Sequence, residues 1–197
     1  SRADATVMTT RWRKTSRFAL RAALKRLPPD QVNLVGLALN QVDMRRRAYF
    51  ERGDETLDAA QAAKMRHIAA KLVLERPGLS VLDIGSGWGG LARSVARDST
   101  ANVTGITLSR EQLAYATART EAEGLAGRVR FHLRDYRDER DRYDRIVSVG
   151  MFEHVGPSDY DNYFSAMAHA LKPDGVALLH SIGIMGPEGG SDPWIRK

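Results

Sequence analysis

The sequence contains no cysteine and no apolar run long enough to span a membrane. The absence of cysteine excludes disulfides, iron–sulfur clusters, thiolate zinc sites and a cysteine nucleophile within these 197 residues. A membrane span needs roughly 20 consecutive apolar residues, and a secretory signal needs an apolar stretch before a small-residue cleavage site. Because neither pattern is present, we expect a cytoplasmic protein.

Positive charge is concentrated at one end of the chain. Residues 1–50 hold 11 Lys and Arg against 3 Asp and Glu, a balance of +8, whereas residues 51–197 hold 19 against 21, a balance of −2. We therefore expect a basic N-terminal segment over residues 1–50 and a separate domain over residues 51–197. A basic segment of this kind can meet nucleic acid, an anionic bilayer or an acidic partner. Within it, Thr10 can cap a helix that runs to Leu27, where Pro28-Pro29 ends it.

From Tyr49 onward, helix-type and strand-type patterns alternate along the chain. Four helices are expected: Thr56 to Leu74, Leu91 to about Arg97, Ser109 to Glu123, and one that begins at a capping box of Ser158 and Asp161 and stops at a turn formed by Lys172-Pro173-Asp174-Gly175. Five short strands are expected: Val81 to Ile84, Asn102 to Thr107, Val129 to Leu133, Arg145 to Val149 and Val176 to Ser181. Strands separated by helices predict an α/β fold, with a parallel sheet of five strands and helices on both faces. Such sheets bind ligands at the carboxyl ends of their strands.

A glycine-rich turn, Gly85-Ser86-Gly87-Trp88-Gly89-Gly90, follows the first of these strands and opens a helix. Glycines at such a point let the backbone approach a ligand closely and adopt positive φ angles. A dinucleotide would need an acidic residue at the end of the second strand, but that strand ends in Thr107-Leu108-Ser109. Asp83, just before the turn, suits an ammonium group or an ordered water better than a pyrophosphate. The pattern favours S-adenosylmethionine over a dinucleotide.

The segment from Val81 to Gly90 resembles motif I of class I S-adenosylmethionine-dependent methyltransferases. Three further stretches are similar to the cyclopropane-fatty-acyl-phospholipid synthase family, which includes the mycolic acid methyltransferases: Val103 to Ser109 with Gln112, Arg145 to Gly156, and Leu171 to Ile182. The resemblance covers roughly residues 48–182, and it implies a Rossmann-like class I methyltransferase fold. It also implies that the final antiparallel strands of that fold are missing from this chain, which ends after five strands.

The resemblance implies where the cofactor would bind. Gly85, Ser86 and Gly87, with Asp83 beneath them, would face the methionine part of S-adenosylmethionine. The ribose would lie near Thr107, Leu108 and Gln112, and the adenine near Asp135 and Tyr136.

The resemblance also implies a base. The family holds bicarbonate with a set of residues of which Glu153, His180 and Ile182 are present here, and this ion would deprotonate the transferred methyl group. We interpret His154, next to Glu153, as structural, because adjacent residues do not easily face the same pocket. No metal site is expected.

The chain departs from the family pattern in one segment. The family's Tyr-Ser-Cys-Ala-Tyr-Phe stretch is Arg45-Arg46-Arg47-Ala48-Tyr49-Phe50 here, so Arg47 occupies the position of a cysteine of the bicarbonate site. Arg47 can still attract bicarbonate through its charge, or the lid over the site is absent or rebuilt.

Three functions therefore remain open. The first is methylene transfer from S-adenosylmethionine to an unsaturated phospholipid acyl chain, with peripheral contact between the basic segment and an anionic membrane. The second is ordinary methyl transfer to a lipid or small molecule. The third is a non-catalytic cofactor-binding or RNA-binding domain; we expect no nucleic acid partner, because the basic segment lacks an aromatic stacking platform. A homodimer is left open.

Overall fold

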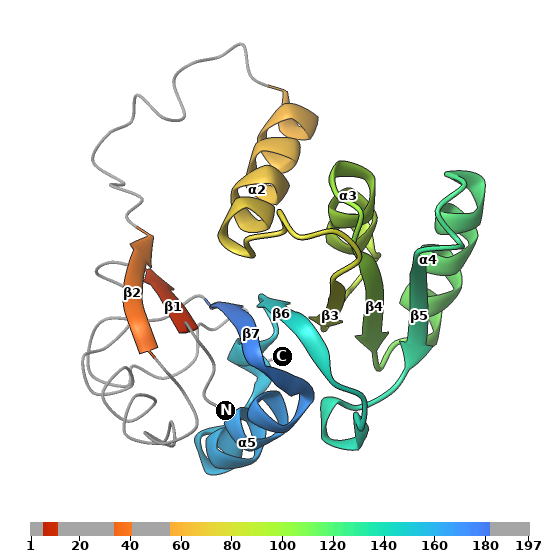
Figure 1. Cartoon of the computed structure of the whole chain (residues 1–197). Coiled ribbons are helices and arrows are strands. Elements are labelled where there is room, and N and C mark those ends of the chain that lie inside the picture. The colour runs from red at the N-terminus through yellow and green to blue at the C-terminus, as the bar shows by residue number, and fades with distance from the viewer. Residues whose placement is uncertain (1–5, 12–33, 41–55, 182–197) are drawn as a thin grey trace.

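An alternation of strands and helices makes up most of the residues that the computed structural model describes, which are 6–11, 34–40 and 56–181 (Figure 1). Five strands form one parallel sheet in the order β5-β4-β3-β6-β7. They are β3 (Ser80–Ile84), β4 (Asn102–Thr107), β5 (Val129–Leu133), β6 (Tyr143–Val149) and β7 (Leu171–His180). The expected parallel sheet is confirmed. From β3 the chain runs outward through β4 to β5 and then returns to the other side of β3 at β6, and ligands bind at such a reversal point of strand order.

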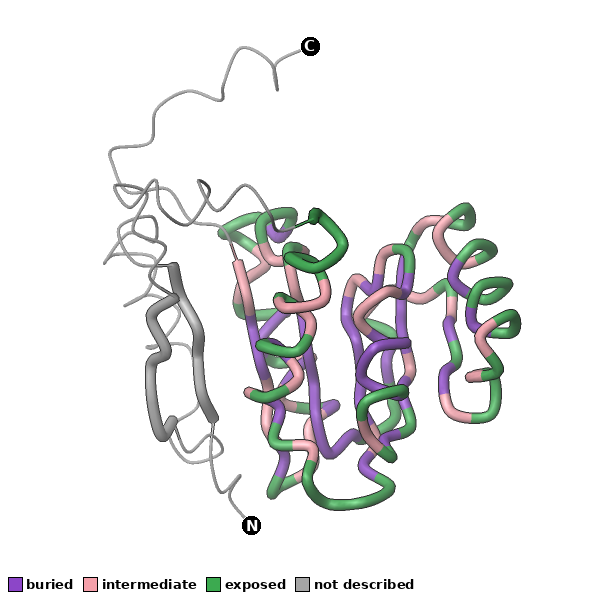
Figure 2. Tube along the Cα trace, turned by 90° about the horizontal axis from the view of Figure 1, so that it is seen from above, coloured by how far each residue is buried: buried purple, intermediate pink, exposed green. Residues whose placement is uncertain are grey.

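Helices cover both faces of this sheet. The helices α2 (Leu57–Lys71), α3 (Gly90–Asp98) and α4 (Arg110–Ala122) contribute to one apolar cluster, and α5 (Tyr160–Ala170) contributes to the other (Figure 1). Neighbouring strand residues alternate between the two clusters: Val81 belongs to the first and Leu82 to the second. Figure 2 shows the consequence, with buried strands in the middle and exposed outer turns of the helices.

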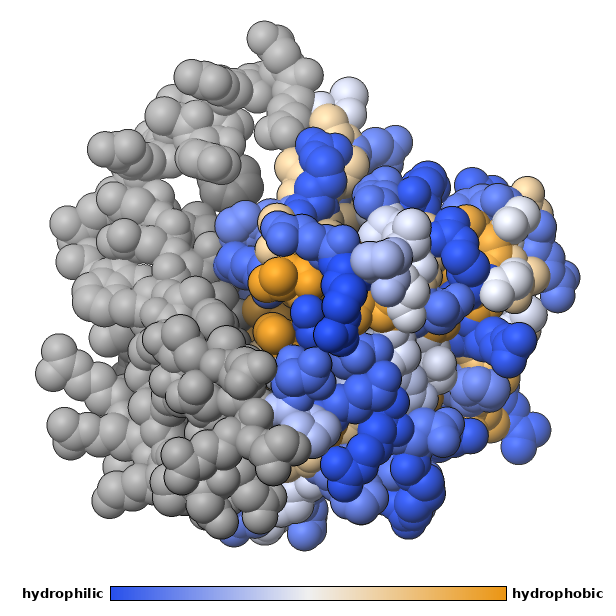
Figure 3. Space-filling model, viewed as in Figure 1, coloured by the Kyte–Doolittle hydropathy of each residue, from blue (hydrophilic) through white to orange (hydrophobic). Residues whose placement is uncertain are grey.

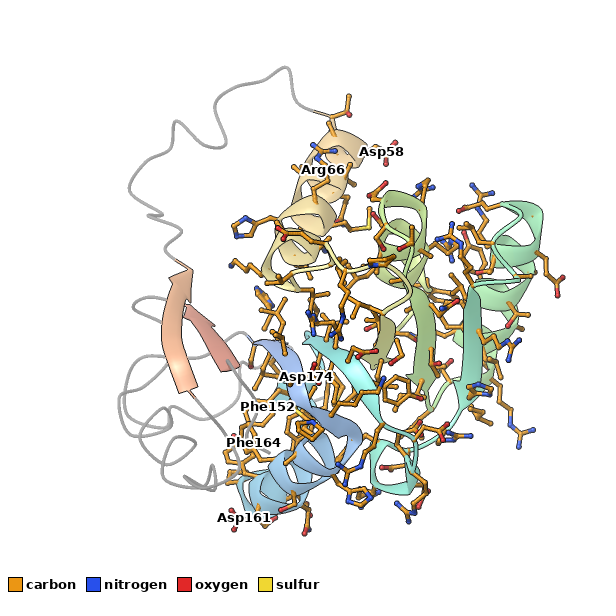
Figure 4. All side chains as sticks on the ribbon, in the orientation of Figure 1. Asp58, Arg66, Phe152, Asp161, Phe164 and Asp174 are labelled. Carbon is orange, nitrogen blue, oxygen red and sulfur yellow. The ribbon has the colours of Figure 1, made fainter. Side chains whose placement is uncertain are left out.

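The second cluster is aromatic. Tyr163 and Phe164 of α5 pack with Phe152 at ring-centroid distances between 5.1 and 5.6 Å, and Phe152 stacks on Tyr160 at 4.7 Å. Figure 4 shows Phe152 and Phe164 side by side over α5. Tyr163, Phe164 and Met167 are buried, so this face of α5 is part of the core.

Two of the expected helix starts are confirmed and one is wrong. The side chains of Thr56 and Ser109 accept hydrogen bonds from the backbone N–H groups of Ala59 and Gln112, so both residues cap their helices. The predicted capping box of Ser158 is absent, because Ser158 lies in a short 3₁₀ helix, η4 (Pro157–Asp159), that precedes α5. Pro157 favours such a turn, and its 3₁₀ winding moves the N-cap by one residue, from Ser158 to Asp159.

The expected turn after α5 is also different. The segment Lys172 to Gly175 lies inside β7, because Leu171 already pairs with Tyr143 of β6. The register then shifts, and the next pair is Arg145 with Val176. The Pro-Asp-Gly sequence therefore forms an irregularity within the strand rather than a separate connection.

An ionic cluster joins the amino ends of three strands. Asp144 Oδ2 accepts hydrogen bonds from the Ser80 backbone N–H and hydroxyl at 2.9 and 2.7 Å and from Lys172 Nζ at 2.9 Å, and Arg76 donates to Oδ1 at 2.9 Å. Burial opposes the charge, but these hydrogen bonds and the ammonium hold the Asp144 pKa well below its usual range. Beside this cluster, Arg145 donates to the carbonyl of Leu72, which ties the end of α2 to β6.

Two further strands precede α2 in the chain. β1 (Thr6–Arg11) and β2 (Leu34–Asn40) pair in parallel, and β1 lies beside β7 (Figure 1). The expected helix from Thr10 to Leu27 is therefore wrong at Thr10 and Arg11, and its other residues lie outside the described ranges. Both strands are short runs rich in threonine or aliphatic residues, a composition that favours strands. Within the ranges given above, no helix is long and apolar enough to cross a membrane.

Candidate functional site

A cavity of about 760 Å³ opens at the carboxyl ends of the sheet strands. Its volume lies within the range of small-molecule sites, and its position is the one expected for a parallel α/β sheet. The lining residues come from the ends of β3, β4, β5 and β6, the start of α4 and the segment before α5: Ile84, Gly85, Gly87, Ile106, Thr107, Leu108, Ser109, Gln112, Arg134, Asp135, Tyr136, Arg137, Gly150, Met151, His154, Val155, Gly156 and Asp159.

The glycine turn forms one wall of the cavity. Gly85 has a φ of +75°, and a Cβ there would lie 2.8 Å from the side chain of Met151. Gly87 has a φ of +54°, and a Cβ there would meet no heavy atom within 4 Å. Gly85 thus needs to be glycine for the fold, while Gly87 leaves space at the cavity wall that a side chain would fill.

Asp83 lies directly before this turn with a fully buried carboxyl group. Its Oδ2 atom has no hydrogen-bond partner among the residues that the structure describes. Burial raises the pKa of Asp83 to about 7. Burying a carboxylate without a partner is costly, and such residues are often retained for function. A cationic ligand group next to the turn would provide the missing partner.

Four residues form the rim between β4 and α4: Thr107, Leu108, Ser109 and Gln112. The Thr107 hydroxyl donates to Gln112 Oε1 at 2.7 Å, and the Ser109 hydroxyl accepts from the Gln112 backbone N–H at 3.2 Å. Leu108 also lines the cavity, and it is 72% exposed. A flat apolar ligand group would cover it.

A charged pair, Asp135 and Arg137, forms another part of the cavity lining. Asp135 accepts hydrogen bonds from Arg137 Nε and Nη2 at 2.9 and 2.7 Å, and the hydrogen bond from Arg137 lowers the pKa of Asp135. Tyr136, between them, packs edge-on against the buried ring of Tyr163 at 5.2 Å. Asp135 and Tyr136 were predicted from the sequence as site residues, whereas Arg137 was not. An aspartate two residues before an arginine, at the start of a turn, is the signal that could have identified it.

A single turn of 3₁₀ helix, η3 (Phe152–His154), contradicts the expectation for His154. His154 lines the cavity, whereas Glu153 does not. A 3₁₀ helix has three residues per turn, so three consecutive side chains point in three directions. Phe152 joins the aromatic cluster, and His154 reaches the cavity.

Glu153 and His180 lie near one another beside the cavity. Burial lowers the pKa of His180, and the neighbouring carboxylate of Glu153 acts in the opposite direction. His180 Nδ1 is buried and has no hydrogen-bond partner in the described part of the chain. Neither residue lines the cavity that the described residues outline. Ile182, the third predicted residue of this group, lies outside those residues.

The cavity thus brings together seven of the nine residues predicted to hold a cofactor. These are Gly85, Gly87, Thr107, Leu108, Gln112, Asp135 and Tyr136. The other two, Asp83 and Ser86, are buried behind the wall, and the Ser86 hydroxyl donates to the carbonyl of Ile106 at 3.3 Å.

The chain is similar to known lipid-modifying enzymes. Residues 34–197 match the family described as mycolic acid cyclopropane synthetase. The chain is 51% identical over 150 residues to the cyclopropane-fatty-acyl-phospholipid synthase of Escherichia coli K12. The aligned region covers 76% of this chain and 38% of that protein. It is 47% identical over 137 residues to a probable fatty acid methyltransferase of Pseudomonas putida, covering 68% of this chain and 34% of that protein. The chain therefore spans well under half the length of these relatives.

Solved structures show the same fold. The cyclopropane synthase MmaA2 from Mycobacterium tuberculosis matches with a TM-score of 0.63 and 39% identity, over 67% of this chain and 46% of that one. The mycolic acid cyclopropane synthase CmaA1, complexed with SAH and CTAB, matches with a TM-score of 0.61 and 39% identity, over 66% and 46% of the two chains. A methyltransferase from Geobacter sulfurreducens in complex with S-adenosyl-L-homocysteine matches with a TM-score of 0.53 and 33% identity, over 59% of this chain and 47% of that chain. The expected Rossmann-like methyltransferase fold is confirmed.

Proposed function

Because the chain belongs to the mycolic acid cyclopropane synthetase family, we propose that it takes part in cyclopropanation of unsaturated phospholipid acyl chains. In this reaction a methylene group passes from S-adenosylmethionine to a double bond, and a cyclopropane fatty acid forms. The chain spans 38% of the length of the Escherichia coli relative, so the activity of the whole protein is part of this proposal.

One observation carries the cofactor assignment: the buried Asp83 carboxyl, whose Oδ2 lacks a partner, lies beneath a glycine turn that leaves space at Gly87. The ammonium of an amino acid is a suitable partner for such a carboxylate. Elsewhere in the cavity lining, Leu108 beside Thr107 offers apolar contact, and Asp135 offers hydrogen-bond acceptors. The residues thus fit S-adenosylmethionine, with its amino acid part near Asp83, its ribose near Thr107 and its adenine near Asp135.

Bound S-adenosylmethionine supplies a methyl group on a sulfonium, an electrophile strong enough for a weakly nucleophilic alkene. The chain's own residues would shield the reacting carbon from water, and Met151 and Val155 make that part of the cavity wall apolar. Shielding matters because an alkene that attacks a methyl group becomes a cation that water would quench.

Glu153 and His180 are the residues that we propose to hold the base. His180 Nδ1 is buried and lacks a described partner, so it can hydrogen-bond an anion such as bicarbonate. The carboxylate of Glu153 is near enough to influence the pKa of His180 and would share the same ion. The backbone at Ile182 completes this group in the family pattern. A base fixed there would remove a proton from the new methyl group so that the ring closes.

Isotope counting tests this function. The chain is incubated with S-adenosylmethionine that carries a fully deuterated methyl group and with vesicles of unsaturated phospholipid, and the acyl chains are examined by mass spectrometry. Cyclopropanation retains two of the three deuterium atoms, because one is lost to the base. Retention of all three contradicts the bicarbonate assignment. Measurable cofactor binding without any product means that residues outside this chain are required.

Ordinary methyl transfer is the second candidate, and the position of His154 favours it. His154 reaches the cavity while Glu153 and His180 do not line it, so an imidazole is available to take a proton from a nucleophilic acceptor. The same isotope count distinguishes this function, because a methylated product keeps all three deuterium atoms.

We also propose peripheral contact with anionic membranes. It is supported by the balance of +8 over residues 1–50 and by the lipid substrates of the named relatives. On the face shown in Figure 3, the surface of the described residues is largely hydrophilic, with an apolar patch near the middle. Flotation with vesicles should show binding that rises with the anionic lipid fraction and falls with salt; equal binding to neutral vesicles would contradict it.

A further inference from the structure

We infer that Arg137 is a positioning residue that makes the cavity selective for adenine by fixing the carboxylate of Asp135. This inference rests on the proposed function, because Asp135 is assigned to adenine through that function. It concerns a residue that lies outside the glycine turn and outside the proposed base site.

The two side chains form a fork-shaped ion pair. Arg137 Nε donates to Asp135 Oδ1 at 2.9 Å and Arg137 Nη2 donates to Asp135 Oδ2 at 2.7 Å. The Arg137 backbone N–H also donates to Oδ1, at 2.9 Å. Each carboxylate oxygen is therefore held by at least one hydrogen bond, and the carboxylate cannot rotate without breaking one of them. Both residues line the cavity.

The arginine is itself held in place. Its guanidinium carbon lies 5.9 Å from the centroid of the Tyr136 ring, and that ring packs against Tyr163 in the core. Arg140 donates to the Arg137 carbonyl at 2.8 Å, which fixes the backbone of the same turn. The exposed guanidinium of Arg137 thus lies over the Tyr136 ring, which in turn packs against the fully buried Tyr163. An ordinary surface ion pair has no such support.

The consequence for a ligand follows from the hydrogen-bonding capacity of a carboxylate. An ionised carboxylate can accept about four hydrogen bonds and donates none, so beyond the three from Arg137 the oxygens retain capacity for an N–H group of a ligand. Adenine presents an amino group that donates, whereas hypoxanthine presents an oxo group at the same position. A fixed carboxylate would attract the first and repel the second. A carboxylate without Arg137 can turn away or take up a proton, and either change removes the repulsion.

Binding of two nucleosides by the chain tests the inference. The probes are S-adenosylhomocysteine and its 6-oxo counterpart, S-inosylhomocysteine, measured by titration calorimetry. The wild-type chain should prefer the adenine compound by about tenfold or more, because a site built around one hydrogen-bond pattern rejects the opposite one. In R137A the preference should fall to within about threefold, and R137K should restore part of it. In a D135N background, R137A should have no further effect on the preference.

The matched control is R119A. Arg119 forms a 3.0 Å ion pair with Glu123 on α4 and is exposed to a similar extent, 57% against 61% for Arg137, but it does not line the cavity. It should leave the preference unchanged, and melting curves should show that R137A remains folded. An unchanged preference in a folded R137A overturns the inference and leaves the proposed function intact. If the wild-type chain binds neither compound, the cofactor assignment itself fails.

Discussion

The hydroxyl of Thr107 donates a hydrogen bond of 2.7 Å to Oε1 of Gln112 and so joins the end of β4 to the first turn of α4. The same hydroxyl accepts a hydrogen bond from the Ser109 backbone N–H at 3.2 Å. Because Thr107 is buried and Gln112 lines the cavity, this pair fixes the rim against which we place the ribose.

Thr107→Val should weaken cofactor binding. Valine keeps the volume and removes the hydroxyl, so Gln112 is released and the rim loses a hydrogen bond worth about 1 kcal/mol. We expect a loss of about fivefold in affinity for S-adenosylhomocysteine, measured by calorimetry. Thr120→Val is the control, because the Thr120 hydroxyl is also buried and donates at 2.7 Å, to Ala116 in α4 and away from this cavity. Equal losses in the two variants would contradict the role of the rim.

Gly87→Ala should reduce cofactor binding by more than its cost in stability. A non-glycine residue at positive φ costs about 1 kcal/mol, and its Cβ would enter space at the cavity wall. Gly78→Ala carries the same backbone penalty, because Gly78 has a φ of +71° and equally open surroundings, but it lies in the loop before β3. We expect similar melting temperatures for the two variants and a loss of about tenfold in affinity for Gly87→Ala alone. An unaffected Gly87→Ala would show that the cofactor does not approach this turn.

Asp144→Ala should destabilise the domain by about 3 kcal/mol, because it leaves Arg76, Lys172 and the Ser80 hydroxyl without their shared partner. Asp174→Ala removes only an exposed partner of Arg76 at 3.3 Å and should cost less than about 1 kcal/mol. Urea unfolding measures both. The difference in unfolding free energy between the two variants should be present at neutral pH and shrink below about pH 4. The Asp144 pKa is depressed in the folded state, so the stability that its carboxylate provides is lost as that carboxylate is protonated. If the Asp144→Ala variant were as stable as the Asp174→Ala variant, the stabilising role of the Asp144 cluster would be contradicted.

Asp83→Asn should stabilise the chain in alkaline solution. Burial raises the Asp83 pKa from 3.8 to about 7, so its contribution to stability is present below pH 3.8 and is lost as the pH rises through about 7. The titration alone costs the folded state about 4 kcal/mol above pH 7. Because a buried amide also lacks partners, we expect a net gain of about 2 kcal/mol at pH 8.5 and a smaller gain at pH 5.5.

Urea unfolding of both proteins at these two pH values measures the gain. A variant that is less stable than the wild type at pH 8.5 would mean that the carboxylate has a partner in the native protein. A gain in stability with a loss of cofactor binding is the pattern of a residue kept for function.

Most strands of the sheet could be predicted because buried strands consist largely of consecutive apolar residues. The bounds of β4 and β5 were predicted to the residue, and those of β3 and β6 to within two residues. The start of β7 was not, because Leu171 joins the sheet through its pairing with Tyr143, a contact between distant parts of the chain. The strand at Thr6–Arg11 was missed because Thr10 is also an acceptable helix cap, and the pairing with β2 that distinguishes strand from helix joins distant parts of the chain.

Some residues of the candidate site could likewise be predicted from a local motif, and others could not. Gly85, Gly87 and Asp83 belong to one local motif; the two glycines line the cavity near which the sequence placed them, whereas Asp83 is buried and does not line it. His154 and Arg137 belong to short turns, where the direction of a side chain depends on the winding of three or four residues. Neighbours in a 3₁₀ turn diverge, so Glu153 and His154 could not be assigned to the same side or to opposite sides from spacing alone.

The most direct test of the central claim is the pH dependence of S-adenosylhomocysteine binding by the wild-type chain and by Asp83→Asn. If the ionised Asp83 carboxylate receives the ligand's ammonium, binding requires a group whose pKa is about 7 to lose its proton. The wild-type affinity should then rise about tenfold between pH 6 and pH 8, and the affinity of Asp83→Asn should be lower and independent of pH over this range. A wild-type affinity that is flat across this range, and equal to that of Asp83→Asn, would contradict the placement of the cofactor beneath the glycine turn.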